Sequence, residues 1–182
     1  MKNVIAVIDD GISEITIPNL EFRKKVYRKK IVDDDTVIDD FSHGSICASI
    51  IKKYAPNARF GSIRILNKTG RGSIKKLIEA IKWCIKNAVK IIHLSIGTTQ
   101  ACDIPGLYNI VNEATEKGCI FIAACKNYSN VSFPASFRNV IGVRADETLT
   151  GMEYKKFHAG VLNSGNPEAI RRHFPLMIYM PI

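Results

Sequence analysis

Short apolar runs that alternate with amphipathic segments are the feature that most constrains the fold of this 182-residue chain. The first run, over residues 4–8, is continuous and rich in Val and Ile, which is typical of a strand buried on both faces of a parallel sheet. The same reasoning predicts strands over residues 60–66, 90–96, 119–125 and 140–143. Helical spacing of apolar residues predicts helices over residues 44–54, 73–87 and 107–117.

Strands that alternate with helices in this way predict an α/β fold, a three-layer sandwich around a mostly parallel sheet. In such sheets, chemistry takes place beyond the carboxyl ends of the strands. The pattern weakens after Ala145, so we expect residues 1–145 to form the core and residues 146–182 a separate tail. Within this tail, we expect a short strand and turn over 159–165, a helix start near Asn166, and an edge strand or docked segment over 174–182.

Composition narrows the class of protein further. Hydrophobic residues make up 46% and charged residues 24%, as in ordinary globular proteins. The five cysteines are odd in number and contain no CxxC pair, which argues against disulfides or a zinc site and favours reduced core thiols. The apolar run before Asp9 is too short for a signal peptide or a membrane span. We therefore expect a cytoplasmic protein with no membrane partner, cofactor or metal.

The net charge of +9 raises the question of nucleic-acid binding. Much of the charge comes from the basic block 23–30, which is followed at once by acidic residues at 33–35 and 39–40. Adjacent blocks of opposite charge are more typical of a solvated hairpin or loop than of a groove for phosphates. We therefore expect no nucleic-acid partner, although an acidic peptide could use the same basic surface.

Three polar segments are placed to meet at one edge of the sheet. Asp9 ends the first predicted strand, His43 begins a helix, and Asn127 follows the strand over 119–125. An Asp can orient a His that acts as a general base toward a hydroxyl nucleophile, and an Asn can donate to a developing oxyanion. A lone His at a helix start is more often a cap or a surface residue, so the argument rests on the three together.

The order of these segments resembles the order of the sequence motifs in the subtilisin-like serine proteases. Val7-Ile8-Asp9-Asp10-Gly11 is similar to the family's first motif, with Asp10 where Ser or Thr is usual, and His43-Gly44-Ser45 is similar to its His motif. Ala123-Ala124-Cys125-Lys126-Asn127 resembles the oxyanion segment. The resemblance implies that Asp9 and His43 are catalytic, that Asn127 stabilises the oxyanion, and that the substrate is a peptide or protein.

The resemblance also implies where a substrate would bind. Gly70, Gly72 and Ser73 lie in a segment that resembles the edge on which the peptide backbone pairs. Leu94, Ser95 and Gly97 lie in a segment that resembles the wall of the first specificity pocket.

The family's nucleophile segment, which resembles Gly-Thr-Ser-Met-Ala, is not reproduced in this chain. Ser164 is the one late candidate, but it follows Asn127 too soon and lacks a helix of small residues behind it. We therefore expect a C-terminally truncated subtilisin-like fold that is inactive or incomplete as it stands. The alternative is a pseudoprotease that binds peptides without turnover.

Three further points complete this interpretation. No pro-segment precedes Asp9, which favours a small intracellular enzyme that processes peptides. An acidic pair after a first strand also occurs in phosphoacceptor receiver domains, but these require an Asp after the third strand, where this chain has Asn67 and Lys68. The family often binds calcium, yet no loop here has the carboxylate spacing that calcium demands.

Overall fold

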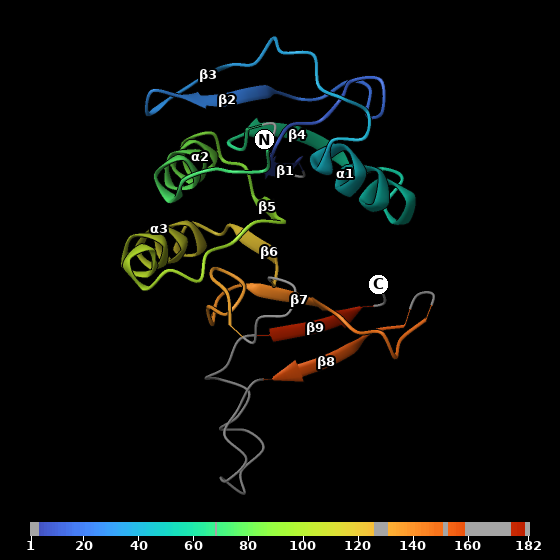
Figure 1. The fold of residues 1–182 in the computed structure, drawn as a ribbon, viewed down its shortest axis with the longest axis vertical. Helices are drawn as coiled ribbons and strands as arrows, with labels where there is room; N and C mark the ends of the chain where they lie inside the picture. The colour runs from blue at the N-terminus through green and yellow to red at the C-terminus, as the bar shows by residue number, and fades with distance from the viewer. Residues whose placement is uncertain (1–3, 68, 126–130, 151–152, 159–175, 181–182) are drawn as a thin grey trace, which may run out of the picture.

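A single twisted sheet runs through the protein in the computed structural model, which describes residues 4–67, 69–125, 131–150, 153–158 and 176–180 (Figure 1). Its strands are β1 (Val4–Asp9), β2 (Arg23–Tyr27), β3 (Lys30–Asp33), β4 (Arg59–Arg64), β5 (Ile91–Leu94), β6 (Ile120–Ala124), β7 (Ile141–Ala145), β8 (Lys155–His158) and β9 (Leu176–Met180). Their order across the sheet is β3-β2-β4-β1-β5-β6-β7-β9-β8. All neighbours from β2 to β9 pair in parallel, and β3 and β8 are antiparallel at the two edges.

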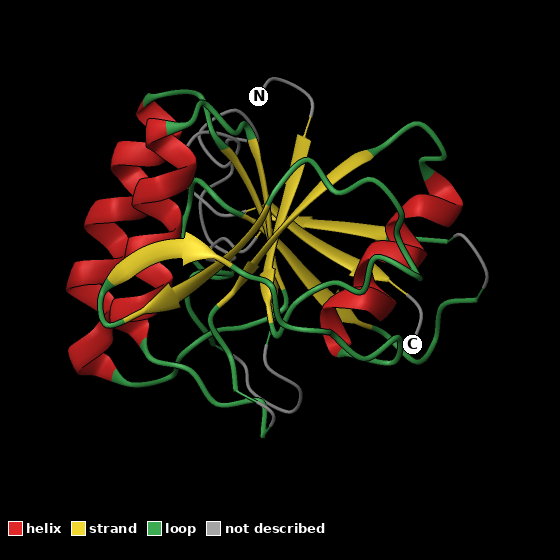
Figure 2. Cartoon of the chain, turned by 90° about the horizontal axis from the view of Figure 1, so that it is seen from above, coloured by secondary structure: helices red, strands yellow, loops and turns green. Residues whose placement is uncertain are grey.

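Helices cover both faces of this sheet, which gives the predicted three layers (Figure 2). They are α1 (His43–Tyr54), α2 (Ile74–Lys86) and α3 (Ile104–Glu116), with a short 3₁₀ helix, η1 (Ala101–Asp103), before α3. The larger core lies between the sheet and the α2–α3 face, where Leu77, Ile81, Leu107 and Val111 are buried. A smaller core around Ile12, Ala48 and Phe60 lies on the α1 side.

The helix ends follow local sequence signals. Ser73 accepts a hydrogen bond from the Lys76 backbone N–H at 3.4 Å and thereby caps α2, as the predicted start at residue 73 implies. Helix α3 begins at Ile104, three residues before the predicted start at Leu107. The difference arises because Pro105 lies in the first turn, where a missing N–H is tolerated.

The basic block 23–30 and the residues that follow it to Asp33 form a hairpin. The sequence favoured a solvated hairpin or loop for this segment. Strands β2 and β3 pair antiparallel around Arg28 and Lys29, whose φ angles are 44° and 63°. Two successive residues with positive φ form the tight turn that matches the twist of paired strands. The hairpin forms one edge of the sheet, where β2 lies next to β4 and β3 is outermost (Figure 1).

The C-terminal strand differs from its predicted position. Strand β9 is not at the edge, because β8 pairs with its outer side at Lys155–His158. It therefore continues the parallel sheet beyond β7. The strand and turn expected over 159–165 and the helix expected near Asn166 lie outside the described residues.

Candidate active site

Asp9 ends the central strand β1 and is completely buried. Its backbone carbonyl accepts hydrogen bonds from the N–H groups of Ile65 and Leu66 at 2.9 and 3.2 Å, which hold this strand end against the segment after β4. Its carboxylate oxygen Oδ1 accepts from the Asp10 N–H at 2.9 Å. The second oxygen, Oδ2, is directed at His43.

Helix α1 carries His43 as its first residue, and the loop after β1 fixes this helix start. The Asp10 carboxylate accepts from the backbone N–H groups of His43 and Gly44 at 3.1 and 2.9 Å. A carboxylate at a helix N-terminus satisfies free N–H groups and complements the helix dipole. Asp10, which departs from the family's usual Ser or Thr, thus has a structural role in positioning His43.

Gly44 allows this close approach between helix and loop. A Cβ atom at residue 44 would lie 2.3 Å from the Gly11 carbonyl oxygen, a distance at which the backbone must move. Ser42 and Ser45 reinforce the junction: the Ser42 hydroxyl donates to the Gly11 carbonyl at 3.1 Å, and the Ser13 N–H donates to the Ser45 hydroxyl at 2.9 Å. The position of the imidazole is therefore set by backbone contacts on both sides.

The Asp9 and His43 side chains form the predicted pair. Asp9 Oδ2 and His43 Nδ1 are 2.9 Å apart, with the Asp buried and the His side chain 56% exposed. Burial raises the pKa of Asp9, and the hydrogen bond and charge of His43 act in the opposite direction. A proton on Nδ1 that faces the carboxylate leaves Nε2 free to accept a proton from another group.

The thiol of Cys47 lies one helical turn after His43. Its sulfur is 4.0 Å from His43 Nε2 and 3.4 Å from the Ser95 hydroxyl oxygen. Burial raises the pKa of this thiol, which keeps it protonated near neutral pH. Asp9, His43 and Cys47 present ligand atoms within 4.8 Å of one another, so they are the described side chains with the geometry to hold a metal ion.

His93 lies in β5 and is a packed histidine. Its Nε2 lies 2.9 Å from the Ser95 hydroxyl, and burial lowers its pKa to about 4. The ring is therefore neutral at physiological pH, and its Nε2 shares a hydrogen bond with the Ser95 hydroxyl. No catalytic step needs it.

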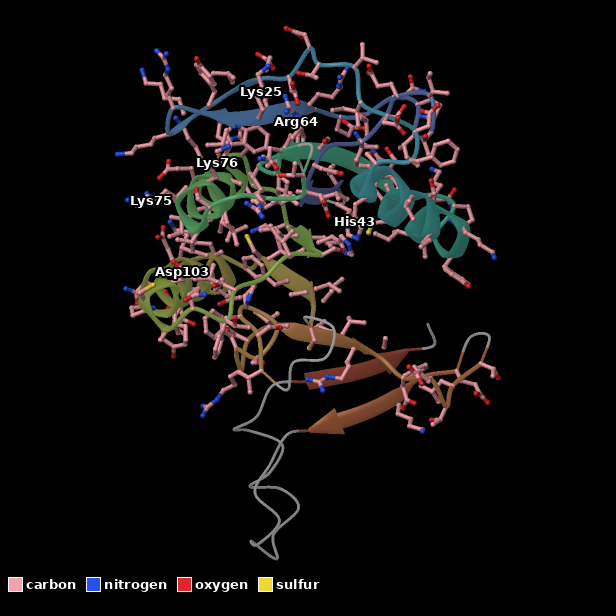
Figure 3. All side chains as sticks on the ribbon, in the orientation of Figure 1. Lys25, His43, Arg64, Lys75, Lys76 and Asp103 are labelled. Carbon is pink, nitrogen blue, oxygen red and sulfur yellow. The ribbon has the colours of Figure 1, made fainter. Side chains whose placement is uncertain are left out.

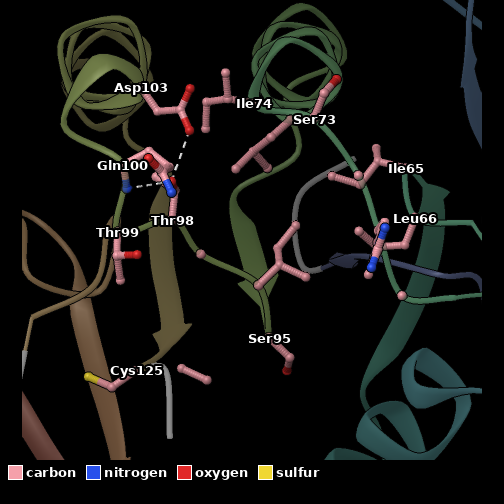
Figure 4. A pocket seen from close by; sticks show the side chains of 17 residues that line it. Ile65, Leu66, Ser73, Ile74, Ser95, Thr98, Thr99, Gln100, Asp103 and Cys125 are labelled. Atoms are coloured by element: carbon pink, nitrogen blue, oxygen red, sulfur yellow. Dashed lines mark hydrogen bonds between the residues drawn. The ribbon is translucent and has the colours of Figure 1, made fainter. Parts of the chain in front are cut away.

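A cavity of about 620 Å³ opens beyond the strand ends and contains most of the predicted substrate residues (Figure 4). Gly70, Gly72 and Ser73 line one side, and Ser95 and Gly97 line the other. Leu94 differs, because its side chain is fully buried in the core and does not form part of the wall. A Cβ atom at Gly97 would lie 2.8 Å from the Phe133 carbonyl oxygen, which explains the glycine at this narrow point.

Asn127 and Ser164 lie outside the described residues, so their predicted roles stay predictions. The end of β6 nevertheless reaches the same edge of the sheet, since Ala124 and Cys125 line the cavity. Cys125 is half-buried there and packs against the core, whereas the sequence favoured a fully buried thiol.

Sequence reasoning missed several residues of this site. Cys84 and Cys119 are buried as expected, but Cys102 is exposed and Cys47 lies beside the Asp9–His43 pair. The spacing of four residues between His43 and Cys47 on a predicted helix was the available signal. Thr98 and Asp103 also line the cavity, and both lie between the strand predicted over 90–96 and the helix predicted over 107–117.

The family model of the subtilases matches residues 2–172, so this chain belongs to the subtilase family. The match continues past residue 145, the predicted end of the core. The division of the chain at that residue stays a prediction.

Two curated relatives illustrate the similarity. The chain is 32% identical over 157 residues to the minor extracellular protease Epr of Bacillus subtilis (strain 168). The aligned segment covers 79% of this chain and 23% of that protein. The chain is also 35% identical over 154 residues to a thermophilic serine proteinase of Bacillus sp. (strain AK1), covering 78% of this chain and 37% of that protein. The chain thus spans well under half the length of these two relatives.

Solved structures support the same fold. The structure of sphericase superposes with a TM-score of 0.69 at 23% identity, over 81% of this chain and 55% of that one. A cold-adapted subtilisin-like serine proteinase gives a TM-score of 0.61 at 24% identity, over 79% of this chain and 54% of that one. Both confirm a subtilisin-like α/β fold, of which this chain forms a part. Among the described residues, none of the helices has the length and hydropathy to cross a membrane.

Proposed function

We propose that this chain supplies the acid–base pair and the peptide cleft of a serine endopeptidase. The observation that carries the proposal is the 2.9 Å contact between buried Asp9 and His43 Nδ1 at the carboxyl edge of a parallel sheet. Membership of the subtilase family supports the same reaction.

In the proposed reaction, His43 Nε2 accepts the proton of a serine hydroxyl while the serine oxygen attacks the scissile carbonyl carbon. Asp9 stabilises the imidazolium that forms, and His43 then returns the proton to the leaving amine. Water hydrolyses the resulting acyl-enzyme with His43 again as base. Asn127 is proposed to donate to the carbonyl oxygen as its negative charge develops.

The proposed substrate is an extended peptide that adds as a strand beside residues 70–74. Ser95 and Gly97 face this edge across the cavity, which is large enough for several side chains. Because a strand directs alternate side chains to opposite faces, the cavity would receive some substrate side chains and leave others in solvent.

The nucleophile distinguishes this proposal from the second candidate, a pseudoprotease that binds peptides without cleaving them. Within the described residues, the hydrogen-bonding contact of His43 Nε2 is with the Cys47 thiol at 4.0 Å, and no serine hydroxyl takes that place. This observation favours the second candidate if Ser164 is not a nucleophile.

Intact mass after treatment with a fluorophosphonate tests the proposal, with His43→Ala as control. A complete endopeptidase would give one adduct on the wild-type chain, located at Ser164 by peptide mapping, and none on the His43→Ala variant. This result would overturn the expectation from the sequence that the chain is inactive or incomplete as it stands. No adduct on the wild type, together with retained peptide binding, would replace the endopeptidase by the pseudoprotease. An adduct that persists without His43 would contradict the proposed acid–base pair.

We further propose that the protein works in the cytoplasm. The odd number of cysteines and the lack of a CxxC pair suit a reducing compartment. Fractionation of the source cells with an antibody to the chain tests this location, and recovery of the protein from the medium would contradict it.

A further inference from the structure

Among the described residues that line the cavity, the acidic one is Asp103, which lies away from His43. Figure 4 shows Asp103 beside Thr98 and Gln100, across from Ile74 at the start of α2. Figure 3 shows Asp103, the last residue of η1, well apart from His43 at the start of α1. The described hydrogen bonds of Asp103 do not reach Asp9 or His43, so its place in the cavity needs another explanation.

Asp103 occupies the residue before α3 but does not cap this helix, since its side chain makes no hydrogen bond to the first turn. Instead, Oδ2 accepts from the Thr98 hydroxyl at 2.9 Å. The Thr98 hydroxyl in turn accepts from the Gln100 N–H at 3.0 Å, so its own proton is directed at the carboxylate. Thr98 is itself held by paired backbone hydrogen bonds with Phe133 at 2.8 and 2.9 Å.

The charge of this oriented carboxylate is not neutralised within the described part of the chain. None of the ion pairs there involves Asp103, although Arg71 lines the same cavity. The neutral Thr98 hydroxyl and the partial charge at the start of α3 are the stabilising groups in its surroundings. A half-buried carboxylate with free hydrogen-bonding capacity attracts a cation with several donors.

Apolar side chains also line this cavity. Ile74 lies opposite Asp103, and Ile65 and Leu77 are 2% and 3% exposed. A cavity that combines apolar walls with a carboxylate fits a side chain with an aliphatic stem and a cationic tip. Arg suits this arrangement best, because its planar guanidinium binds a carboxylate through two hydrogen bonds, and Lys provides one point charge.

We propose that Asp103 and the surrounding cavity form a subsite that binds an Arg or Lys side chain of the peptide, away from the cleavage point. The subsite rests on the proposed function, since it requires a peptide strand beside residues 70–74. It determines which peptides bind, and Thr98 is its positioning residue.

Peptide binding measured by fluorescence anisotropy tests the subsite without requiring turnover. The probes are labelled peptides of otherwise constant sequence in which Arg, Lys, citrulline or Leu occupies each position in turn. Citrulline keeps the shape of Arg but has no charge. At one position, we expect the Arg peptide to bind the wild type about tenfold more tightly than the citrulline peptide.

Asp103→Asn should reduce this ratio to about one, because Asn keeps the size of Asp and an oxygen that can accept from the Thr98 hydroxyl, but not the charge. Glu113→Gln is the matched control: it removes the same charge from an exposed residue near the other end of α3 and should leave the ratio unchanged. Thr98→Val removes the hydroxyl that orients the carboxylate and should lower the ratio several-fold. If Asp103→Asn does not fold, Thr98→Val still tests the subsite.

The outcomes separate the subsite from the proposed function. Binding of many peptides with equal affinity for Arg and citrulline at every position would overturn the subsite and leave the cleft intact. An Arg preference that survives in both variants would also overturn it. A wild-type chain that binds none of the peptides would overturn the peptide cleft, and the subsite with it.

Discussion

Two buried aspartates, Asp9 and Asp34, lie at the same end of the sheet but have opposite environments. Their exposed fractions are 0% and 5%. Asp9 faces the half-exposed imidazole of His43 and one backbone N–H. Asp34 follows β3, and its carboxylate accepts two hydrogen bonds from Arg64, from Nε at 2.7 Å and from Nη2 at 3.0 Å. The amine of Lys25 lies 3.3 Å from the same carboxylate.

The two pKa values move in opposite directions as a result. Burial raises the pKa of Asp9, and His43 offsets only part of this effect. Burial also acts to raise the pKa of Asp34, but the hydrogen bonds from Arg64 and Thr36 outweigh it and hold the pKa well below its ordinary value. Burial alone therefore does not determine the state of a carboxylate. A permanently charged partner makes Asp34 a structural anion, whereas the described contacts of Asp9, the imidazole of His43 and one backbone N–H, include no permanently charged group.

Replacing Asp9 by Asn should have the largest effect, and it should act on reactivity rather than stability. If the proposed function holds, the rate of fluorophosphonate labelling should fall about 10⁴-fold, because Asn no longer selects the tautomer with a free Nε2. The melting temperature should stay equal or rise, since a buried charge is removed. Asp33→Asn, at an exposed carboxylate, is the control, and a fall in rate of less than tenfold in Asp9→Asn would contradict this assignment.

Replacing Asp34 by Asn should act on stability alone. We expect the free energy of unfolding in urea to fall by about 2–3 kcal/mol, because charged hydrogen bonds are lost and Arg64 is left without its partner. Asp33→Asn, where the carboxylate is 78% exposed and pairs with Lys24, should change stability by less than about 0.5 kcal/mol. Equal losses in the two variants would show that the Arg64 pair carries no special weight.

A fall in pH should change the contributions of Asp9 and Asp34 to the free energy of unfolding in opposite directions. The folded pKa of Asp34 lies below 3.8, so its stabilisation is present above that pH and is lost as pH falls toward the folded value. The folded pKa of Asp9 lies above 3.8, so its contribution favours the folded state at low pH and is lost as pH rises through the folded value.

Urea unfolding between about pH 6 and pH 3 measures this difference. Relative to the wild type, Asp34→Asn should lose less stability on acidification and Asp9→Asn should lose more. The reverse order would contradict both directions of pKa shift.

Replacing Lys25 by Met should have the smallest effect. Its amine lies 3.3 Å from Asp34 at a site that is 31% exposed, so we expect a loss of at most about 0.5 kcal/mol. A double-mutant cycle with Asp34→Asn measures the coupling directly. A coupling above about 1 kcal/mol would show that Lys25, and not Arg64 alone, holds Asp34.

Much of the fold was predictable because its signals are local. The apolar run at 4–8, the cap at Ser73 and the alternation of strands with helices all concern residues near one another in sequence. Asp9 and His43 were also predictable as a pair, since parallel strands bring their carboxyl ends to one edge. The place of β9 inside the edge strand β8 was not predictable, because nothing near residues 176–180 indicates that β8 covers its outer side.

The sequence by itself determined the α/β class, the order of the main elements and the family of this protein. Only the tertiary structure decided that Asp10 holds the start of α1, that Asp34 pairs with Arg64 from 30 residues away, and that Asp103 turns from its helix toward Thr98. The physical reason is that helix and strand signals are read over a few residues, whereas a carboxylate takes its role from the donors that the fold brings to it. In this protein, those donors come from other elements.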